Sequence, residues 1–251
     1  ADALEAMSVD YEPLQAVVNM ESAISPGSTL VHEDKGTNTC YVYNLGGGYD
    51  EKVKEADVVI KRRFINQRLI PAFMEPRSVV AAPMGMSDEI TMWTSTQIPH
   101  ILRLLIALVT GIPENNLRVI APDVGGGFGG KLQIYREEIL VAQLARKLGR
   151  PVKWTETRSE DMVATHHGRD QIQDIELAAK SDGTLVGLKV DLKANMGAYL
   201  QIITPGIPLL GMFMYPGIYK MDAYDFQCTG VFTNTTPTDA YRGAGRPEST
   251  Y

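Results

Sequence analysis

The chain contains little cysteine. Of its 251 residues only Cys40 and Cys228 carry a thiol, and no C-x-x-C pair occurs. Two distant cysteines supply neither a disulfide framework nor the ligand set of an iron–sulfur cluster. We expect both thiols to be buried in a reducing compartment, which favours a cytoplasmic location.

Excess basic charge and long apolar runs are also missing. The net charge is −6, which argues against nucleic acid as a partner because phosphate binding needs a clustered basic surface. The densest basic cluster, Lys61-Arg62-Arg63, lies inside an expected strand and is interpreted as a solvated face. The longest strongly apolar run, residues 101–109, is interrupted by Arg103 and is too short to cross a bilayer. No transmembrane segment is therefore expected.

The sequence also lacks a set of His, Cys, Asp or Glu residues with the spacing of metal ligands. His166 and His167 are adjacent, so on a helix their side chains would point about 100° apart, and no third ligand lies at helical spacing. We expect them at a helix end or on the surface, with no protein-ligated metal.

Apolar periodicity, glycines and prolines divide the chain into alternating strands and helices. Strands are predicted over residues 7–13, 57–65, 78–83, 89–94, 117–121, 151–156, 170–180 and 184–195. Helices are predicted over residues 20–24, 98–110 and 134–148, the last two ending at Gly111 and Gly149. This order predicts an α+β fold of mixed α/β layers. Three consecutive glycines within residues 44–50 predict a boundary between one unit at 1–48 and another at 57–251.

The most informative segment is Asp123-Val124-Gly125-Gly126-Gly127-Phe128-Gly129-Gly130-Lys131. Its five glycines remove side chains from a stretch between an expected strand and an expected helix. Glycine permits close approach to the backbone, and bare amides before a helix suit an anion. We therefore expect a ligand to approach this segment.

The residues alone leave several interpretations of this segment open. Gly125, Gly127 and Gly130 match the G-x-G-x-x-G pattern of a Rossmann-type dinucleotide-binding protein, with Glu156 at the end of the next expected strand. The P-loop pattern fails because Leu132 stands where a magnesium-binding hydroxyl is required. In the third interpretation the segment is a mobile surface turn. The large apolar ring of Phe128 argues against it, because such turns are rich in small and polar residues.

Several motifs together resemble one known family. The central segment is similar to the molybdopterin-site motif of the molybdenum hydroxylase large subunit, the family of xanthine dehydrogenase, aldehyde oxidoreductase and aerobic carbon monoxide dehydrogenase. Further segments resemble that family in the same order: Tyr11-Glu12-Pro13-Leu14, Gln67-Arg68-Leu69-Ile70-Pro71, Met74-Glu75-Pro76-Arg77, Thr94-Ser95-Thr96-Gln97 and Ala240-Tyr241-Arg242-Gly243-Ala244-Gly245-Arg246-Pro247-Glu248. The resemblance implies a fragment: the C-terminal part of an α/β hammerhead domain, followed by the first part of a molybdopterin-binding domain.

The resemblance also implies site residues. In the family the metal is held by a pterin dithiolene, and the protein places hydrogen bonds around it. Gln97 would donate to the metal's oxo ligand, although a helix cap is an alternative role. The backbone of Gly126, Gly127, Phe128, Gly129 and Gly130 would run beside the cofactor, with amides near Phe128 and Gly129 meeting an oxygen and Lys131 adding positive charge.

Arg242 would supply a guanidinium to phosphate or pterin oxygens, and its alternative is an ion pair with Asp239 or Glu248. The Phe128 ring is alternatively a core plug that fixes the loop.

The implied reaction is oxidative hydroxylation of a carbon with oxygen from water, and it requires a general base. The family's base is a glutamate in a C-terminal motif that this chain lacks, and neither Glu75 nor Glu248 replaces it. The cofactor would be molybdenum–molybdopterin, as the cytosine dinucleotide form. Iron–sulfur clusters would lie on a small subunit and FAD on a medium subunit, in a dimer of heterotrimers, and the isolated fragment would be inactive.

Three residues bear on the substrate. Purine-oxidising relatives carry a glutamate where this chain has Leu132 and a phenylalanine where it has Ala244. The copper-binding cysteine of the carbon-monoxide-oxidising form corresponds to Gly243. The chain is thus most similar to the second form of the carbon monoxide dehydrogenase large chain, and the resemblance implies an aldehyde or an N-heteroaromatic ring as substrate.

Overall fold

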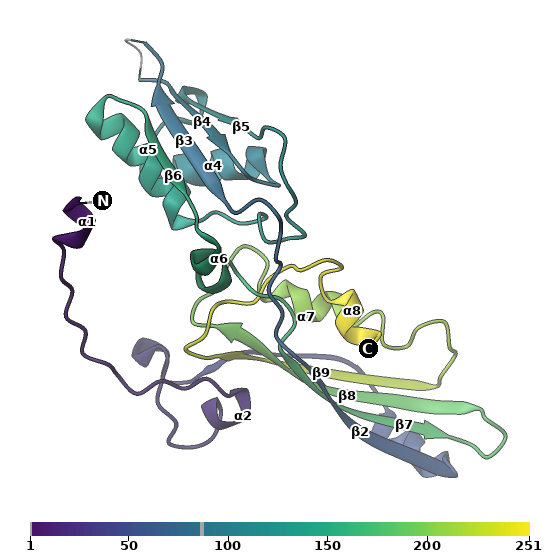
Figure 1. Cartoon of the computed structure of the whole chain (residues 1–251). Helices are drawn as coiled ribbons and strands as arrows, with labels where there is room; N and C mark the ends of the chain where they lie inside the picture. Colours follow the sequence, from purple (N-terminus) through teal and green to yellow (C-terminus); the bar gives the residue numbers. More distant parts are fainter. Residues whose placement is uncertain (1, 86–87) are drawn as a thin grey trace.

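The computed structural model describes residues 2–85 and 88–251. It contains two β-sheets with helices packed on them, joined by long loops that run between the sheets (Figure 1). The mixture of antiparallel and parallel strand pairs agrees with the predicted α+β class.

The larger sheet has five strands in the order β1-β9-β8-β7-β2. Its members are β1 (Thr39–Gly47), β2 (Val58–Asn66), β7 (Gln171–Ala179), β8 (Leu185–Gly197) and β9 (Ala223–Phe232). Neighbouring strands are antiparallel except for β8 and β9, which are parallel. The predicted hairpin at 170–195 is confirmed as β7 and β8. One face packs an apolar core around Leu192, Phe226 and Cys228. Both cysteines are free, but Cys40 is only partly buried.

The smaller sheet has the strand order β5-β4-β3-β6. Its strands are β3 (Ser78–Pro83), β4 (Ile90–Thr94), β5 (Leu117–Ile120) and β6 (Val152–Thr155). Two helices pack on it, α4 (Pro99–Thr110) and α5 (Arg136–Leu148), and they bury Leu102, Ile106 and Val141 against the strands. Both helices end at glycines with positive φ, Gly111 and Gly149, as the sequence predicts.

The remaining elements are short. They are α1 (Asp2–Glu5), α2 (Met20–Ala23), α3 (Tyr49–Lys52), α6 (Arg158–Ala164), α7 (Gly206–Gly211), α8 (Arg246–Ser249) and the 3₁₀ turns Glu33–Lys35, Val53–Glu55 and Glu114–Asn116. In Figure 1, α6, α7 and α8 lie between the two sheets. Within the described ranges, the helices all fall short of the length and apolarity that crossing a membrane requires.

The first residues differ from the prediction. Residues 7–19 form no strand and are mostly exposed, because no neighbouring strand in the described part supplies hydrogen bonds to them. β1, from the first predicted unit, pairs along its length with β9 from the second. The division at residues 48–57 stays a prediction, and any such boundary crosses a continuous sheet.

The basic cluster lies on β2, and its side chains are exposed as predicted. Arg63 forms an ion pair with Asp174 at 2.7 Å, and Lys61 forms one with Glu176 at 2.7 Å. Both acids lie on the adjacent strand β7. The positive charge of this strand is thus largely balanced within the sheet.

Candidate functional site

Two loops meet between the sheets and carry most of the predicted site residues. We call residues 123–131 the glycine loop and residues 240–246 the arginine loop. The Arg242 backbone N–H donates to the Phe128 carbonyl across 2.8 Å. On the other side of the glycine loop, the Gln97 N–H donates to the Lys131 carbonyl at 2.9 Å. Residues distant in the sequence therefore form one surface.

The glycines are required by the chain's own packing. A Cβ on Gly127 would lie 2.4 Å from Gln97 Oε1, and one on Gly129 would lie 2.0 Å from the Ala240 carbonyl oxygen. A Cβ on Gly130 would lie 2.6 Å from the Phe73 ring. Protein groups make these three close approaches, and the approach of a ligand to this segment stays a prediction.

Gln97 is oriented by the glycine loop. Its Oε1 accepts hydrogen bonds from the backbone N–H groups of Gly129, at 2.9 Å, and Lys131, at 3.2 Å. The oxygen is therefore fixed toward the loop, and the Nε2 amide group lies at the other side of the planar carboxamide. The N-cap of α4 is Ile98, so the alternative role of Gln97 as helix cap is wrong. In residues 2–85 and 88–251, Nε2 has no acceptor, and the side chain is exposed.

Two amides within residues 126–130 of the glycine loop have no protein acceptor among the described residues, and one of them belongs to the buried residue Gly127. The N–H groups of Gly127 and Phe128 have no acceptor within the described chain. The Gly129 N–H is taken by Gln97, and the Gly130 N–H by the Gly127 carbonyl. The available donors are thus one residue earlier than expected.

Lys131 does not supply positive charge to the surface. Its side chain is fully buried, with Nζ 2.8 Å from Glu75 Oε2 and 4.6 Å from the centre of the Phe73 ring. Burial lowers the pKa of Lys131, although Glu75 opposes the shift. Burial also acts to raise the pKa of Glu75, but hydrogen bonds from Lys131, the Gly125 amide and Ser95 leave it lowered. The pair therefore anchors the loop as a neutralised unit, correcting the sequence-based expectation.

Phe128 and Arg242 are both on the surface. Phe128 has a φ of 53° and its residue is 46% exposed, so the alternative of a core plug is wrong. The Arg242 guanidinium carbon lies 5.8 Å from the centre of the Phe128 ring. Its two alternative partners are engaged elsewhere: Glu248 pairs with Arg169 at 2.9 Å, and Asp239 accepts from Thr204 at 2.8 Å. The exposed guanidinium is available to a ligand.

The three predicted substrate residues flank this surface. Leu132 is half-buried and its N–H donates to the Gly129 carbonyl at the end of the glycine loop. Gly243 and Ala244 form the tip of the arginine loop with φ values of 108° and 48°. A Cβ on Gly243 would lie 2.5 Å from Pro247. Their role in substrate selection stays a prediction.

The geometry does not fit a Rossmann dinucleotide site. That site needs glycines at the start of a helix that leads to an adjacent parallel strand, but α5 begins only at Arg136. The next strand, β6, pairs antiparallel with β3 and lies at the opposite edge of the sheet from β5. Glu156 is buried and bonds to Arg77 at 2.5 Å, so it cannot reach a ribose. The alternative assignment is therefore wrong.

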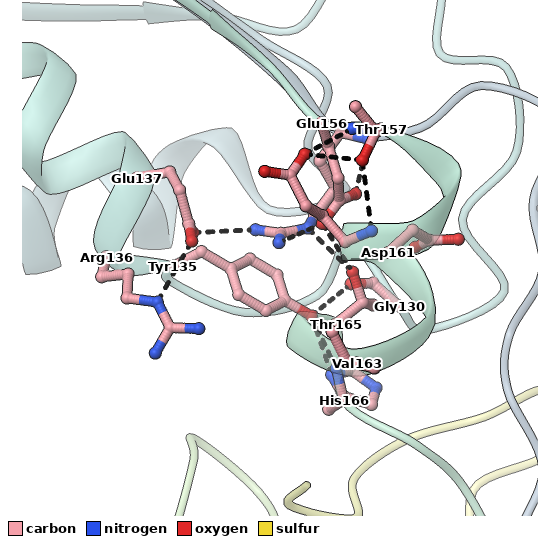
Figure 2. Close-up of polar contacts among 12 residues, drawn as sticks. Gly130, Tyr135, Arg136, Glu137, Glu156, Thr157, Asp161, Val163, Thr165 and His166 are labelled. Atoms are coloured by element: carbon pink, nitrogen blue, oxygen red, sulfur yellow. Dashed lines mark hydrogen bonds and ion pairs between the residues drawn. The ribbon is translucent and has the colours of Figure 1, made fainter. Parts of the chain in front are cut away.

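Behind the glycine loop lies a buried polar network that the sequence did not reveal. The Tyr135 hydroxyl donates to the Gly130 carbonyl at 2.6 Å and lies 3.1 Å from His166 Nδ1 (Figure 2). The Arg77 guanidinium stacks on the Tyr135 ring at 3.6 Å and donates to Thr165 at 2.9 Å. His166 lies at a helix end, directly after the C-cap of α6, as one of the two expectations had it, whereas the alternative of a surface role is wrong because the residue is fully buried.

His167 is also largely buried, and its ring nitrogens lie within hydrogen-bond distance of Arg68 and the Met162 carbonyl. In the sequence, only the adjacent histidines drew attention to this region. Their aromatic and basic partners lie far away in the chain and could not be identified from the sequence.

The donors are arranged as an anion-binding surface rather than a metal-ligating one. No group of three or more His, Cys, Asp or Glu side chains could hold a metal within residues 2–85 and 88–251. Instead, unpartnered donors come from Gln97, Gly127, Phe128 and Arg242. Such a set fits an oxygen-rich cofactor that brings its own metal ligands.

A surface with several unpartnered donors suits a domain that binds an oxygen-rich cofactor. The model of the molybdopterin cofactor-binding domain matches residues 31–251 of the chain. The chain therefore belongs to this family, and the resemblance noted from its motifs is confirmed.

Individual relatives agree with this assignment. The gamma subunit of the 6-hydroxypseudooxynicotine dehydrogenase complex of Paenarthrobacter nicotinovorans is 35% identical over all of this chain and 31% of its own length. The carbon monoxide dehydrogenase large chain of Afipia carboxidovorans is 34% identical over 93% of this chain and 31% of its own. The crystal structure of quinoline 2-oxidoreductase from Pseudomonas putida 86 superposes with a TM-score of 0.91, at 32% identity, over 97% of this chain and 31% of that one. The chain thus spans about a third of the length of these relatives.

Proposed function

We propose that this chain is the part of a molybdenum hydroxylase large subunit that holds one side of the molybdopterin cofactor. The observation that carries this proposal is the cluster of unpartnered donors on Gln97, Gly127, Phe128 and Arg242. The family assignment supports it, because a molybdopterin cofactor offers oxo, pterin and phosphate oxygens to such donors.

When bound, molybdenum–molybdopterin supplies oxygen insertion from water together with transfer of two electrons. The chain's own residues bind and orient it. Gln97 would donate from Nε2 to an oxygen of the cofactor, because its Oε1 is fixed by the Gly129 and Lys131 amides. The Gly127 and Phe128 amides add preorganised dipoles, which are most effective where water is excluded.

Arg242 provides the charge at this site. Its guanidinium offers several donors in a planar fork, a geometry suited to phosphate or to adjacent pterin oxygens. Because Lys131 is neutralised by Glu75, the net positive charge toward an anionic cofactor comes from the arginine loop. Phe128 supports the guanidinium from one side.

The general base lies outside this chain in our proposal. Glu75 accepts hydrogen bonds from Lys131, Ser95 and the Gly125 amide. Although burial acts in the opposite direction, these bonds lower the pKa of its carboxyl group, so that it is a weak base. Glu248 is buried against Arg169. Neither carboxylate is available to take a proton from a reacting oxygen.

We further propose a multi-subunit enzyme. The name of the Paenarthrobacter relative describes a subunit of a complex, which supports the presence of partner subunits. The proposed partners are an iron–sulfur small subunit and an FAD-binding medium subunit, in a dimer of heterotrimers. The two free cysteines suit a reducing, cytoplasmic location. The cytosine dinucleotide form of the pterin completes this proposal, and mass spectrometry of released cofactor tests it.

An aldehyde or an N-heteroaromatic compound is the proposed substrate. Gly243 offers no thiol to copper, and Leu132 and Ala244 offer neither a carboxylate nor a ring to a purine. The name of the quinoline 2-oxidoreductase supports a heteroaromatic substrate for a similar fold.

Dye-reduction assays on the complete complex test this proposal. We expect turnover of an aldehyde or of a heteroaromatic ring such as quinoline, with no sustained turnover of carbon monoxide or xanthine. Carbon monoxide oxidation by a copper-containing preparation would contradict the substrate assignment.

A further inference from the structure

A tyrosine and a histidine connect the two loops of the candidate site from behind. Tyr135 lies just before α5, and its hydroxyl donates to the Gly130 carbonyl at the end of the glycine loop, at 2.6 Å. His166 follows α6, and its Nε2 lies 2.9 Å from the carbonyl of Ala240 at the start of the arginine loop. The two side chains meet at 3.1 Å (Figure 2).

The donor and the acceptor of each hydrogen bond in this connection can be assigned. A carbonyl only accepts, so His166 Nε2 must carry a proton to bond Ala240. Burial lowers the pKa of His166 to about 4, so the ring is neutral near pH 7 and Nδ1 is an acceptor. Burial raises the pKa of Tyr135, which keeps its proton. The single hydroxyl proton therefore serves both Gly130 and His166.

Both ends of the connection touch groups that shape the cofactor surface. The Ala240 carbonyl lies against Gly129, where a Cβ would come within 2.0 Å of its oxygen. Two residues later, the Arg242 N–H donates to the Phe128 carbonyl. Arg77 stacks on the Tyr135 ring, with the guanidinium carbon 3.6 Å from the ring centre. The pair is fully enclosed, with Tyr135 at 5% exposure and His166 at 0%.

We propose that Tyr135 and His166 are positioning residues that set the separation of the glycine loop from the arginine loop. Neither side chain reaches the cofactor surface, because both are buried behind the loops that form it. They act by fixing the Gly130 and Ala240 carbonyls, and through them the donors of Phe128 and Arg242. This role rests on the proposed function only for its catalytic consequence; the structural link is testable without it.

Removal of the Tyr135 hydroxyl tests the link in the complete enzyme complex. Tyr49→Phe is the control, because it removes the hydroxyl of a similarly buried ring that donates to Glu176 on β7 at 3.4 Å, in the larger sheet and away from both loops. Hydrogen–deuterium exchange of the peptide containing residues 240–246 reports on the Arg242 amide. Loss of one hydrogen bond corresponds to about tenfold faster exchange.

We expect Tyr135→Phe to accelerate exchange at residues 240–246 and to lower turnover per bound molybdenum, and Tyr49→Phe to do neither. Equal exchange in both variants at these residues would overturn the proposal.

Two substitutions of His166 test the proposal if Tyr135→Phe does not fold. The amide nitrogen of Gln can replace Nε2 and bond the Ala240 carbonyl, whereas Leu cannot. We expect His166→Gln to retain slower exchange at 240–246 than His166→Leu. Identical exchange in these two variants would contradict the link. A parent complex without pterin would instead contradict the proposed function and leave the exchange comparison valid.

Discussion

Arg242 and Phe128 contact each other twice: the Arg242 N–H donates to the Phe128 carbonyl at 2.8 Å, and the Arg242 guanidinium lies 5.8 Å from the Phe128 ring centre. These two contacts hold together residues that are more than a hundred positions apart in the chain. The backbone contact joins the two loops, and the side-chain contact places a positive charge near the Phe128 ring. A motif search that treats the two loops separately would miss this relationship.

Gln97→Ala should lower the turnover rate more than it lowers the cofactor content. The substitution removes the Nε2 donor and the oxygen that accepts from the Gly129 and Lys131 amides, while Arg242 and the Gly127 and Phe128 amides remain. Loss of a comparable oxyanion donor costs about 10²–10³ in rate, so we expect turnover per bound molybdenum to fall on that order. His100→Ala, on the exposed side of α4, is the control. Equal turnover per molybdenum in Gln97→Ala and the parent would exclude the assigned role.

Gly129→Ala should damage the site far more than Gly149→Ala. Both glycines have positive φ, 103° and 61°, so both substitutions carry a backbone cost of about 1 kcal/mol. Only at Gly129 would the new Cβ meet another group, the Ala240 carbonyl at 2.0 Å; at Gly149 nothing lies within 4 Å. We expect Gly129→Ala to lose bound pterin and Gly149→Ala to keep it. Thermal unfolding and pterin content measured on both variants decide the point, and similar losses in both would refute it.

The stability of the chain should depend on the neutral state of His166. Burial lowers the pKa of its ring to about 4, whereas an exposed histidine titrates near 6.5. The resulting stabilisation is complete above about pH 6.5 and is lost as the pH falls toward 4, because only the unfolded chain gains the proton. Compared with His166→Gln, the parent should lose about 2 kcal/mol of unfolding free energy between pH 7.5 and 5. Urea titrations that give the same difference at both pH values would contradict this.

Glu138 should produce the opposite pH dependence. Burial raises the pKa of its carboxyl to about 7, despite hydrogen bonds from Thr94 and the Tyr135 amide. The folded protein therefore retains a proton that the unfolded chain loses above about pH 4.3. This contribution is favourable at low pH and is lost as the pH rises to about 7. Glu138→Gln should gain stability relative to the parent from pH 5 to pH 8 in the same urea titrations, and a constant difference would disprove the assignment.

Local sequence predicted the elements well, and long-range packing decided the rest. Helix α4 and the β7–β8 hairpin follow from apolar spacing, Gly111 and the Asp182-Gly183 turn, all of which act over a few residues. The strand predicted at residues 7–13 failed because a strand needs a partner, which spacing cannot supply.

The same distinction holds for the candidate site. Motifs identified Gln97, the glycine loop and Arg242, but not the partners that set their chemistry. The charge of Lys131 is cancelled by Glu75, and His166 is buried against Tyr135. Both outcomes depend on contacts between segments at least thirty positions apart, so no local pattern encodes them.

The molybdenum and pterin content of the purified complete complex tests the central claim most directly. Cells supplied with molybdate provide the parent, Arg242→Ala and the control Arg62→Ala, which alters an exposed arginine on β2. Metal analysis and pterin fluorescence after acid oxidation then measure cofactor per large subunit. We expect near-stoichiometric molybdenum and pterin in the parent and in Arg62→Ala, and a marked loss of both in Arg242→Ala. A parent complex that contains neither molybdenum nor pterin, or an Arg242→Ala complex with the full content of both, would contradict it.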